Sequence, residues 1–514
     1  MRLDRLYILF CLLFSAAITG CASKGNNQEI NNSNNQRVLA ASETIETELG
    51  ESRSLLPDFM CYNVNSVRVV DWQDNNFIAA TNNLSPGRLR IPGGDVGNYW
   101  DWQRGGLIEN IAGLPAGLPF FLRFKARQYN ASKLSNFQAG LATTNTQPIF
   151  VLNMLTSDLE SQLAMLREAQ SLGMEIKYVE LGNELYFNIP NYKKVFPNPR
   201  AYGLAAKEWA IAIKQEFPDA QIAVVGIVPS ANKPPRLQNW NKVMRGTVLP
   251  AADVITLHTY YDHGLNSQKN QSKEYPYFEA EEANIILGEP FRNWQKLQRD
   301  RNYQVIPENK KIWITEYNLF EDIFKDGKDK PIPRVAGSWT HGLYNLATSL
   351  LFLEESRIES ICNHSLIEGS IFGAVLDKED SFVNPADPKM TATPMSLSAT
   401  GSALSVLGKA TQGMTSAAAI EFKNLSQLVG KDNFEYPAVY GWQFSNNTDK
   451  QAIIINLSSR KVEIDSSSFA TNFNYQQLFA DPKALINDPQ VLNKTQGKGN
   501  NKITLPAYSV TNIY

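Results

Sequence analysis

Residues 176–184 read Ile-Lys-Tyr-Val-Glu-Leu-Gly-Asn-Glu, an apolar-rich run that ends in a glycine and two polar residues. Such a run, with β-branched and aromatic residues and a turn-forming residue at its end, predicts a buried strand. The stretches on either side of it, 158–172 and 201–216, carry apolar residues at helical spacing. A strand between two such helices is typical of a parallel sheet whose strands are joined by crossover helices.

The same alternation of strand and helix recurs from about residue 55 to residue 411. Eight parallel strands that alternate with helices form a closed barrel. We therefore predict an α/β fold, a (β/α)8 TIM barrel, for residues 55–411. The eight predicted strands are 59–61, 88–91, 148–153, 176–181, 221–226, 254–258, 311–315 and 358–363.

The pattern changes after a last predicted helix at 396–407. Short runs that alternate apolar and polar residues follow, and Asn, Ser, Gly and Asp-Pro separate them. This pattern predicts antiparallel strands, so the second domain, 412–514, is expected to be a small β-sandwich. Its expected strands are 438–444, 452–457, 461–464 and 502–513.

The N-terminus carries the features of an export signal. Two arginines within residues 1–5 precede an apolar stretch, 6–17, which is too short to span a bilayer, and Ile-Thr-Gly-Cys follows at 18–21. We expect a signal peptide at 1–20 and a flexible, Asn-rich tether at 21–54. The alternative is an ordinary secretory signal in which Cys21 has no role.

This N-terminal segment is similar to the signals of bacterial lipoproteins. The resemblance implies cleavage before Cys21, acylation of its sulfur, and a membrane anchor that more than one acyl chain makes stable. The expected location is the cell envelope, at the outer membrane if the cell is Gram-negative.

Composition excludes some partners and cofactors. The 49 basic residues are balanced by 51 acidic ones, and no long basic run lies outside the N-terminus, so we expect no nucleic-acid partner. The four cysteines and four histidines lack the spacing of a zinc site, so we expect no metal and no cofactor.

Two cysteines lie within the predicted barrel, Cys61 in its first strand and Cys362 in its eighth. Closure of the barrel makes these strands neighbours, with backbones about 4.8 Å apart. A disulfide also needs both side chains on the same face. Two separate buried thiols are the more common outcome, and the sequence leaves both possibilities open.

Polar residues lie where most of the predicted strands end. In a (β/α)8 barrel the catalytic groups come from these carboxyl ends. The polar residues at these ends are Arg90, Asn153, Asn183, Glu184, His258, Tyr260, Glu316, Asn363 and His364. Two other polar residues, Glu180 and His341, are expected to be structural, with Glu180 pointing between its strand and the helices.

Two of these polar residues are carboxylates on opposite sides of the barrel. Glu184 follows the fourth strand and Glu316 follows the seventh. Cleavage of a glycosidic bond needs two carboxyl groups that face each other across the substrate, about 5 Å apart in a retaining enzyme. This pair therefore favours a carbohydrate substrate.

The motifs around these residues resemble those of clan A retaining glycoside hydrolases. Val-Glu-Leu-Gly-Asn-Glu at 179–184 resembles the acid/base motif of that clan, and Trp-Ile-Thr-Glu-Tyr-Asn at 313–318 resembles its nucleophile motif. Leu-Arg-Ile-Pro-Gly-Gly at 89–94 and Asn-Tyr-Trp-Asp-Trp at 98–102 are similar to the heparanase/β-glucuronidase, arabinofuranosidase and β-xylosidase families. These families also carry a C-terminal sandwich, whose closing strand resembles 505–510. One departure is Leu185, where many relatives have proline.

The resemblance implies a retaining glycoside hydrolase that works by double displacement. Glu184 would be the acid/base and Glu316 the nucleophile, with Tyr260 donating a hydrogen bond to Glu316 and Arg90 fixed behind it. The substrate-binding residues would be Arg90, Asn153, Asn183, His258, Tyr260 and His364, with Asn183 on the sugar 2-hydroxyl.

Two questions stay open at the level of sequence. A catalytically inactive, carbohydrate-binding lipoprotein is the alternative function. The sugar is also undetermined, since arabinofuranoside, glucuronide and xyloside enzymes share these motifs. An anionic sugar would need basic residues in the cleft, such as Lys125, Arg127 or Arg334.

Overall fold

The structure is a computed structural model, and it describes part of the chain. The described residues are 44–64, 66, 71–108, 132–228, 235–237, 239–265, 278–321, 334–368, 372–378, 380 and 390–514. The expected signal peptide, the lipidation site at Cys21 and most of the expected tether lie outside these residues. Within them, no helix combines the length and apolar character needed to cross a membrane.

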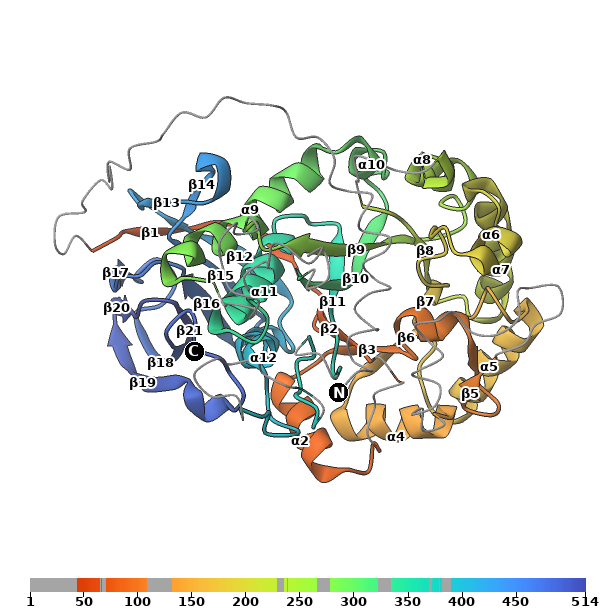
Figure 1. Cartoon of the computed structure of the whole chain (residues 1–514), viewed down its shortest axis with the longest axis horizontal. Coiled ribbons are helices and arrows are strands. Elements are labelled where there is room, and N and C mark those ends of the chain that lie inside the picture. The colour runs from red at the N-terminus through yellow and green to blue at the C-terminus, as the bar shows by residue number, and fades with distance from the viewer. Residues whose placement is uncertain are drawn as a thin grey trace, which may run out of the picture.

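Eight parallel strands form a closed barrel (Figure 1), which confirms the predicted fold. Each predicted strand corresponds to one barrel strand, with ends that differ by a few residues. Around the barrel the order is β10-β11-β2-β3-β6-β7-β8-β9, so that the last barrel strand, β11, pairs with the first, β2. The strands are β2 (Met60–Asn63), β3 (Arg88–Ile91), β6 (Gln147–Val151), β7 (Tyr178–Leu181), β8 (Gln221–Val225), β9 (Val254–Asp262), β10 (Lys311–Phe320) and β11 (Ile358–His364).

Helices cover the outside of the barrel (Figure 1). Side-chain caps define where several of them begin: Asp158 accepts a hydrogen bond from the backbone of Ser161, and Asn198 accepts one from the backbone of Ala201. The helices are α2 (Asn75–Leu84), α4 (Leu134–Thr144), α5 (Leu159–Ser171), α6 (Pro190–Val195), α7 (Pro199–Glu216), α8 (Trp240–Thr247), α9 (Ala283–Arg299), α10 (Arg301–Gln304), α11 (Trp339–Phe352) and α12 (Ala399–Thr411).

The barrel interior is filled in layers because side chains along a strand alternate between inside and outside. The lower layer is an apolar cluster that takes one residue from each of seven strands. Its members are Cys61, Ile149, Tyr178, Ala223, Val254, Trp313 and Cys362. Residues two positions further along each strand point into the barrel above this layer, toward the carboxyl ends of the strands.

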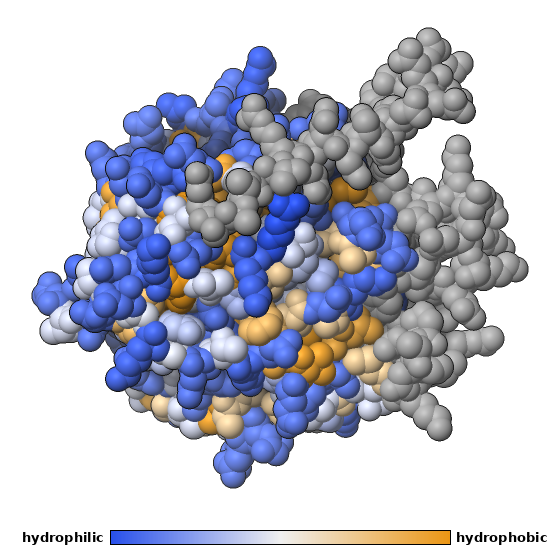
Figure 2. Space-filling model, turned by 90° about the vertical axis from the view of Figure 1, so that its left-hand side faces the viewer, coloured by the Kyte–Doolittle hydropathy of each residue, from blue (hydrophilic) through white to orange (hydrophobic). Residues whose placement is uncertain are grey.

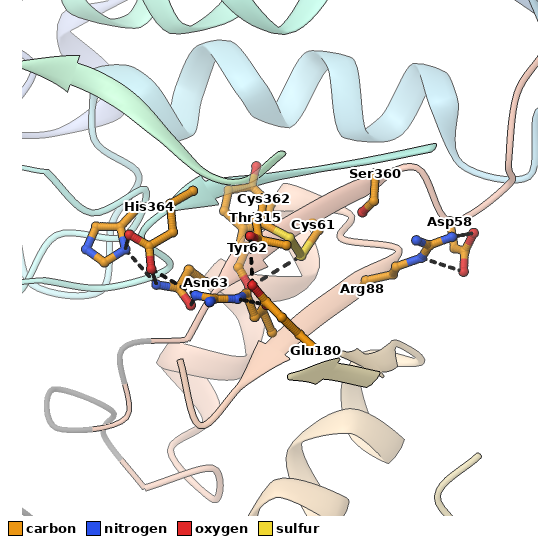
Figure 3. Close-up of a disulfide and its surroundings, with 12 residues drawn as sticks. Asp58, Cys61, Tyr62, Asn63, Arg88, Glu180, Thr315, Ser360, Cys362 and His364 are labelled. Atoms are coloured by element: carbon orange, nitrogen blue, oxygen red, sulfur yellow. Dashed lines mark hydrogen bonds and ion pairs between the residues drawn. A yellow bond between two sulfur atoms is a disulfide. The ribbon is translucent and has the colours of Figure 1, made fainter. Parts of the chain in front are cut away.

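Cys61 and Cys362 form a disulfide within this lower layer (Figure 3). The two residues are direct partners in the parallel pairing of β2 with β11, and their Cα atoms are 4.1 Å apart. This shared register places both side chains on the inner face, which is the condition that sequence could not decide. Of the two possibilities left open, the structure therefore has the disulfide.

We expect the double substitution C61A/C362A to lower the free energy of unfolding by about 2–5 kcal/mol, because the disulfide closes a long loop. The two cysteines are separated by 301 positions in sequence. The measurement is urea unfolding followed by circular dichroism. Wild-type protein unfolded in the presence of reductant is the control. It lacks the cross-link but keeps both cysteine side chains, so the difference from the double variant is due to packing. An unchanged unfolding midpoint in both samples would show that the disulfide does not form.

A seven-stranded antiparallel sheet forms beside the barrel, in the order β1-β12-β15-β16-β21-β18-β19, together with the two-stranded sheet β17-β20. This arrangement confirms the expected C-terminal sandwich (Figure 1). Its strands are β1 (Thr47–Ser54), β12 (Ser416–Phe422), β15 (Val439–Ser445), β16 (Lys450–Asn456), β17 (Val462–Asp465), β18 (Asn472–Phe479), β19 (Asn493–Asn500), β20 (Lys502–Leu505) and β21 (Ser509–Ile513). The hairpin of β13 (Gln427–Val429) and β14 (Glu435–Pro437) packs on α9.

The outer surface of the sandwich is polar. Edge strand β19 reads Asn-Lys-Thr-Gln-Gly-Lys-Gly-Asn and is largely exposed, and the corresponding face of the molecule is mostly hydrophilic, with apolar side chains gathered in a few places (Figure 2). Lysines on an edge strand discourage pairing with another chain.

Strand β1 corrects the expected extent of the tether. Residues 47–54 were assigned to that tether, but they pair antiparallel with β12 in the sandwich sheet. The strand is held through its backbone at the edge of the sheet, and most of its side chains are exposed or half-buried. Because exposure makes its composition polar, the sequence of this strand resembles that of a flexible segment.

The barrel and the sandwich share one apolar core. The indole of Trp339, at the start of α11, donates a hydrogen bond of 2.6 Å to the carbonyl of Tyr508, just before β21. Tyr440 of β15 donates one of 2.8 Å to Glu354. Helix α12 ends at Thr411, beside the expected domain boundary at residue 412.

Candidate active site

A tight turn after β7 presents Glu184. Gly182 has φ +85°, and a Cβ atom there would lie 2.4 Å from Leu185, so only glycine fits. Glu184 itself has φ +44°, a conformation that non-glycine residues adopt rarely and that concentrates at functional sites. The turn therefore directs Glu184 over the end of the barrel.

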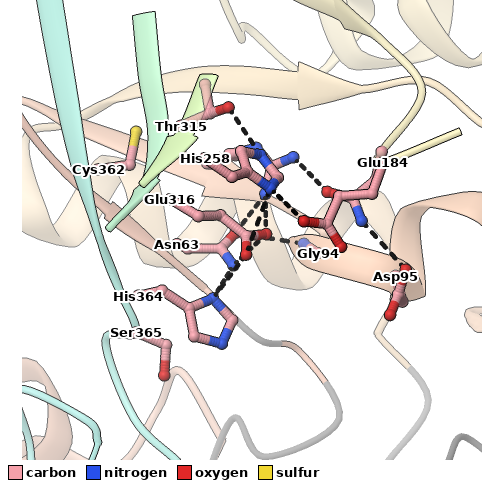
Figure 4. Close-up of polar contacts among 12 residues, drawn as sticks. Asn63, Gly94, Asp95, Glu184, His258, Thr315, Glu316, Cys362, His364 and Ser365 are labelled. Atoms are coloured by element: carbon pink, nitrogen blue, oxygen red, sulfur yellow. Dashed lines mark hydrogen bonds and ion pairs between the residues drawn. The ribbon is translucent and has the colours of Figure 1, made fainter. Parts of the chain in front are cut away.

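A register shift in β10 presents Glu316. Ile314 pairs with Leu257 of β9, whereas Glu316 pairs with the next residue, His258, so Thr315 is an extra residue in β10. An irregularity of this kind re-aims the side chains around it. As a result both Thr315 and Glu316 contact groups inside the barrel, although neighbours in a regular strand point to opposite faces (Figure 4).

Three side chains hold the carboxylate of Glu316. Arg90 donates a hydrogen bond of 2.8 Å to Oε1, and Asn63 donates one of 3.3 Å to the same oxygen. The hydroxyl of Tyr260 donates one of 2.7 Å to Oε2. These donors fix the orientation of the carboxylate, and the contacts of Arg90 and Tyr260 agree with those that the family resemblance implied.

The charges around Glu316 keep it ionised. Burial by itself would raise the pKa of this carboxyl group, but the positive charges of His258, His364 and Arg90, together with the Tyr260 hydrogen bond, hold the pKa at about 2. His258 and His364 lie 3.7 and 3.5 Å from Oε2. Glu316 is thus an oriented anion at neutral pH.

Arg90 organises the base of the site. Its side chain is fully buried, and its guanidinium donates to Glu180 at 2.6 Å, to Glu316 at 2.8 Å and to Asn183 at 2.7 Å. Glu180 therefore does not point between strand and helices, as the sequence suggested. It lies two positions beyond Tyr178 of the lower layer, so it points into the barrel (Figure 3).

Glu184 faces Glu316 and has a different set of neighbours. Tyr186 donates a hydrogen bond of 2.9 Å to Oε1 of Glu184, and Nδ1 of His258 lies 2.8 Å from the same oxygen. One carboxylate oxygen of Glu184 and one of Glu316 lie within 4.8 Å of each other. The site thus pairs a carboxylate held by cations with a second carboxyl group that contacts a tyrosine hydroxyl and a histidine.

His258 links the two carboxylates. Its Nδ1 faces Glu184, and its Nε2 lies 3.1 Å from the hydroxyl of Thr315. Burial opposes the charged form of His258, but the neighbouring Glu316 and Glu184 outweigh burial and raise its pKa above the usual value. His258 therefore contributes positive charge between the two carboxylates.

A third carboxyl group, Asp95, lies beside this pair. It belongs to the short 3-10 helix η2 (Gly94–Asn98) that follows β3. Asn183 donates a hydrogen bond of 3.1 Å and Tyr192 one of 3.0 Å, both to Oδ1 of Asp95. Burial raises the pKa of Asp95 to about 7, and the charges of Glu184 and Glu316 act in the same direction.

The structure brings together most of the candidate residues identified from sequence. Asn153 differs: its amide donates hydrogen bonds to the carbonyl of Trp100 at 3.1 Å and to the hydroxyl of Thr156 at 2.7 Å, which are contacts that shape the loops. The candidates that contact one another around the two carboxylates are Arg90, Asn183, Glu184, His258, Tyr260, Glu316 and His364.

Sequence reasoning missed several residues of the site. Alternation along the strands could have identified Asn63, which is two positions beyond Cys61 on the same inner face. The missed or misplaced residues are Asn63, Asp95, Glu180, Thr315 and Glu368. His341 was read as structural: it is buried, its Nε2 lies 2.9 Å from Asn318, and burial lowers its pKa to about 3.

Glu184, His258 and Glu316 could each offer one ligand atom to a metal ion. The other contacts in the site make this a poor metal site. Arg90 already supplies positive charge to Glu316, and both nitrogens of His258 have partners. A metal ion here would be repelled by the adjacent guanidinium.

Comparison of the chain with protein-family models and with curated protein sequences found no match. Solved structures do match. A family 51 α-L-arabinofuranosidase from Bifidobacterium longum is 14% identical with a TM-score of 0.66, and covers 92% of this chain and 99% of its own. The likeness is one of fold.

Two further structures extend this comparison. A 4-O-α-L-rhamnosyl-β-D-glucuronidase from Fusarium oxysporum is 12% identical with a TM-score of 0.57, covering 92% of this chain and 100% of its own. A family 44 xyloglucanase from Paenibacillus polymyxa is 12% identical with a TM-score of 0.56, covering 92% of this chain and 99% of its own. Both the barrel and the sandwich are therefore shared with these proteins.

Proposed function

We propose that this chain is a retaining glycoside hydrolase, with Glu316 as nucleophile and Glu184 as acid/base. The observation that carries the proposal is the pair itself: two carboxyl groups from β7 and β10, with oxygens within 4.8 Å of each other and with different surroundings. In retaining enzymes the two carboxyl groups are about 5–5.5 Å apart, whereas inverting enzymes need about 6.5–9.5 Å to admit a water molecule.

In the first step Glu316 attacks the anomeric carbon while Glu184 protonates the leaving oxygen. Arg90 and Tyr260 hold Glu316 in position through hydrogen bonds of 2.8 and 2.7 Å. The glycosyl-enzyme ester that forms has lost the negative charge of Glu316. In the second step Glu184 takes a proton from water, which attacks the anomeric carbon and releases the sugar.

The fold adds support, since the solved structures that share it include an arabinofuranosidase, a glucuronidase and a xyloglucanase. Their sugars differ, so fold alone does not choose a substrate.

The test of this function is hydrolysis of 4-nitrophenyl glycosides by a soluble form that lacks residues 1–21. We expect release of nitrophenol from at least one glycoside, in the presence or absence of EDTA. Proton NMR of the first-formed sugar should show the anomeric configuration of the substrate. An inverted product would contradict the retaining mechanism. Sugar binding without turnover would support the inactive, carbohydrate-binding alternative.

We also propose that the chain is exported and anchored to a membrane through Cys21. The Cys61–Cys362 disulfide supports export, because disulfides persist in oxidising compartments.

For the anchor, we expect Cys21→Ala to move the protein from the membrane fraction to the soluble fraction while it stays active, because the acyl chains that hold it are lost. Fractionation with immunoblotting and labelling with a palmitate analogue measure this. Cys21→Ser, which also removes the thiol, should give the same redistribution, and the parent protein is the reference. A parent protein without label would contradict the anchor.

A further inference from the structure

We infer that the site takes a neutral sugar and that Asp95 is a specificity-determining residue which disfavours a sugar ring bearing a carboxylate. This inference rests on the proposed function and names the substrate class of the same site. Two features of the described residues carry it: the pairing of the cations in the site, and the position of the Asp95 carboxyl group.

Three cations contact the two carboxylates, and each of them has an acidic partner; Arg236, beside Leu185, donates instead to the backbone carbonyls of Leu185 and Tyr192. Arg90 pairs with Glu180 at 2.6 Å as well as with Glu316. His258 lies 2.8 Å from Glu184.

His364 also has acidic partners: its Nε2 lies 3.0 Å from Glu368 and its Nδ1 lies 3.5 Å from Glu316. A carboxylate on the sugar would therefore find each of these three cations engaged with an acidic group. Of the three basic residues named above for an anionic substrate, Lys125 and Arg127 lie outside the described residues, and Arg334 is described, with its backbone carbonyl accepting a hydrogen bond from the amide of Phe278.

Asp95 places a further carboxyl group beside this cluster. Both of its described hydrogen bonds, from Asn183 and from Tyr192, go to Oδ1. The residue is half-buried. Figure 4 shows Asp95 next to Glu184, with one oxygen toward the amide that holds it and the other directed away. A ligand in contact with Glu184 and Glu316 is therefore also close to Asp95.

The charge of Asp95 depends on pH, which makes its effect measurable. Burial raises the pKa of Asp95 to about 7, helped by the charges of Glu184 and Glu316. Below that pH the group holds a proton, and above it the group is an anion, so its repulsion of a second carboxylate should grow as pH rises. The titratable groups that interact with Asp95 are Glu184, Glu316, Tyr99, Tyr186 and Tyr192.

The experiment compares two inhibitors that differ only at C6, methyl β-D-glucoside and methyl β-D-glucuronide. Inhibition constants are measured with the fastest neutral 4-nitrophenyl glycoside as substrate. We expect the ratio of the glucuronide constant to the glucoside constant to rise about tenfold between about pH 5.5 and about pH 8.5 in the wild type. In Asp95→Asn the rise should be absent, because the amide does not ionise.

Tyr192→Phe is the matched control, because it removes a hydrogen bond to Asp95 and leaves the carboxyl group in place. That hydrogen bond lowers the pKa of Asp95. The rise should therefore persist in Tyr192→Phe but start at higher pH, a shift that a purely structural role for Asp95 would not produce.

The outcomes separate the inference from the proposed function. Tighter binding of the glucuronide, a flat ratio in the wild type, or an equal rise in Asp95→Asn would overturn the inference while hydrolysis stands. If folded wild-type protein cleaves none of the neutral or acidic aryl glycosides, the proposed function fails and the inference fails with it.

Discussion

Glu316→Ala should lower kcat by about 10^4-fold or more, since it removes the carboxylate that forms the glycosyl ester in the proposed mechanism. Alanine also removes one carboxylate from the buried Arg90, which keeps Glu180. Glu316→Gln keeps a polar group at this place and should lose the same activity with less change in stability. Stopped assays with 4-nitrophenyl glycosides measure the rates, and circular dichroism checks folding.

A small anion offers a sharper readout of the Glu316 variant. In Glu316→Ala, azide can occupy the space of the missing carboxylate and attack the anomeric carbon from the same face. The product should be a glycosyl azide of inverted configuration, visible by NMR. Glu208→Ala, on the exposed surface of α7, is the matched control and should keep wild-type activity. Full activity in Glu316→Ala would rule out this residue as the nucleophile.

Glu184→Ala should have an effect that depends on the leaving group. Substrates with poor leaving groups, such as methyl glycosides, should lose about 10^2–10^4-fold in kcat/KM, because their departing oxygen needs a proton. Activated 2,4-dinitrophenyl glycosides need little protonation, so their kcat/KM should change far less. Steady-state kinetics across a series of aryl glycosides measures this dependence.

The second step gives an independent check on Glu184. Without a base, the glycosyl ester should accumulate, so that kcat and KM for activated substrates fall together. Azide, which needs no base, should restore turnover and give a glycosyl azide with the configuration of the substrate. A uniform loss across all leaving groups would contradict the acid/base role of Glu184.

Local patterns explain why much of the fold could be predicted. The eight barrel strands are short apolar runs, and the glycine before Asn183 and Glu184 marks a turn that only glycine allows. The carboxyl ends of the strands meet at one end of a barrel, so the sequence is enough to pair Glu184 with Glu316. The predicted contacts of Glu316 with Arg90 and Tyr260 came from the family resemblance.

Other features depend on contacts between segments far apart in the chain. The polar strand β1 resembles a tether because only its backbone pairing with β12 makes it a strand. Asn153 ends a predicted barrel strand, as a binding residue would, but its amide donates to the carbonyl of Trp100 and to the hydroxyl of Thr156. Neither the pairing of β1 with β12 nor the contacts of the Asn153 amide can be predicted from the residues next to them in the sequence.

Periodicity and turn residues along the chain are enough to predict the strand–helix order, the barrel with its sandwich, and the two glutamates at the strand ends. The register between strands is visible only in the folded structure. Register places Cys61 beside Cys362, and the extra residue in β10 turns Glu316 inward. Strand pairing sets which residues face each other across hundreds of positions, and a slip of one residue would turn every side chain of a strand to the other face.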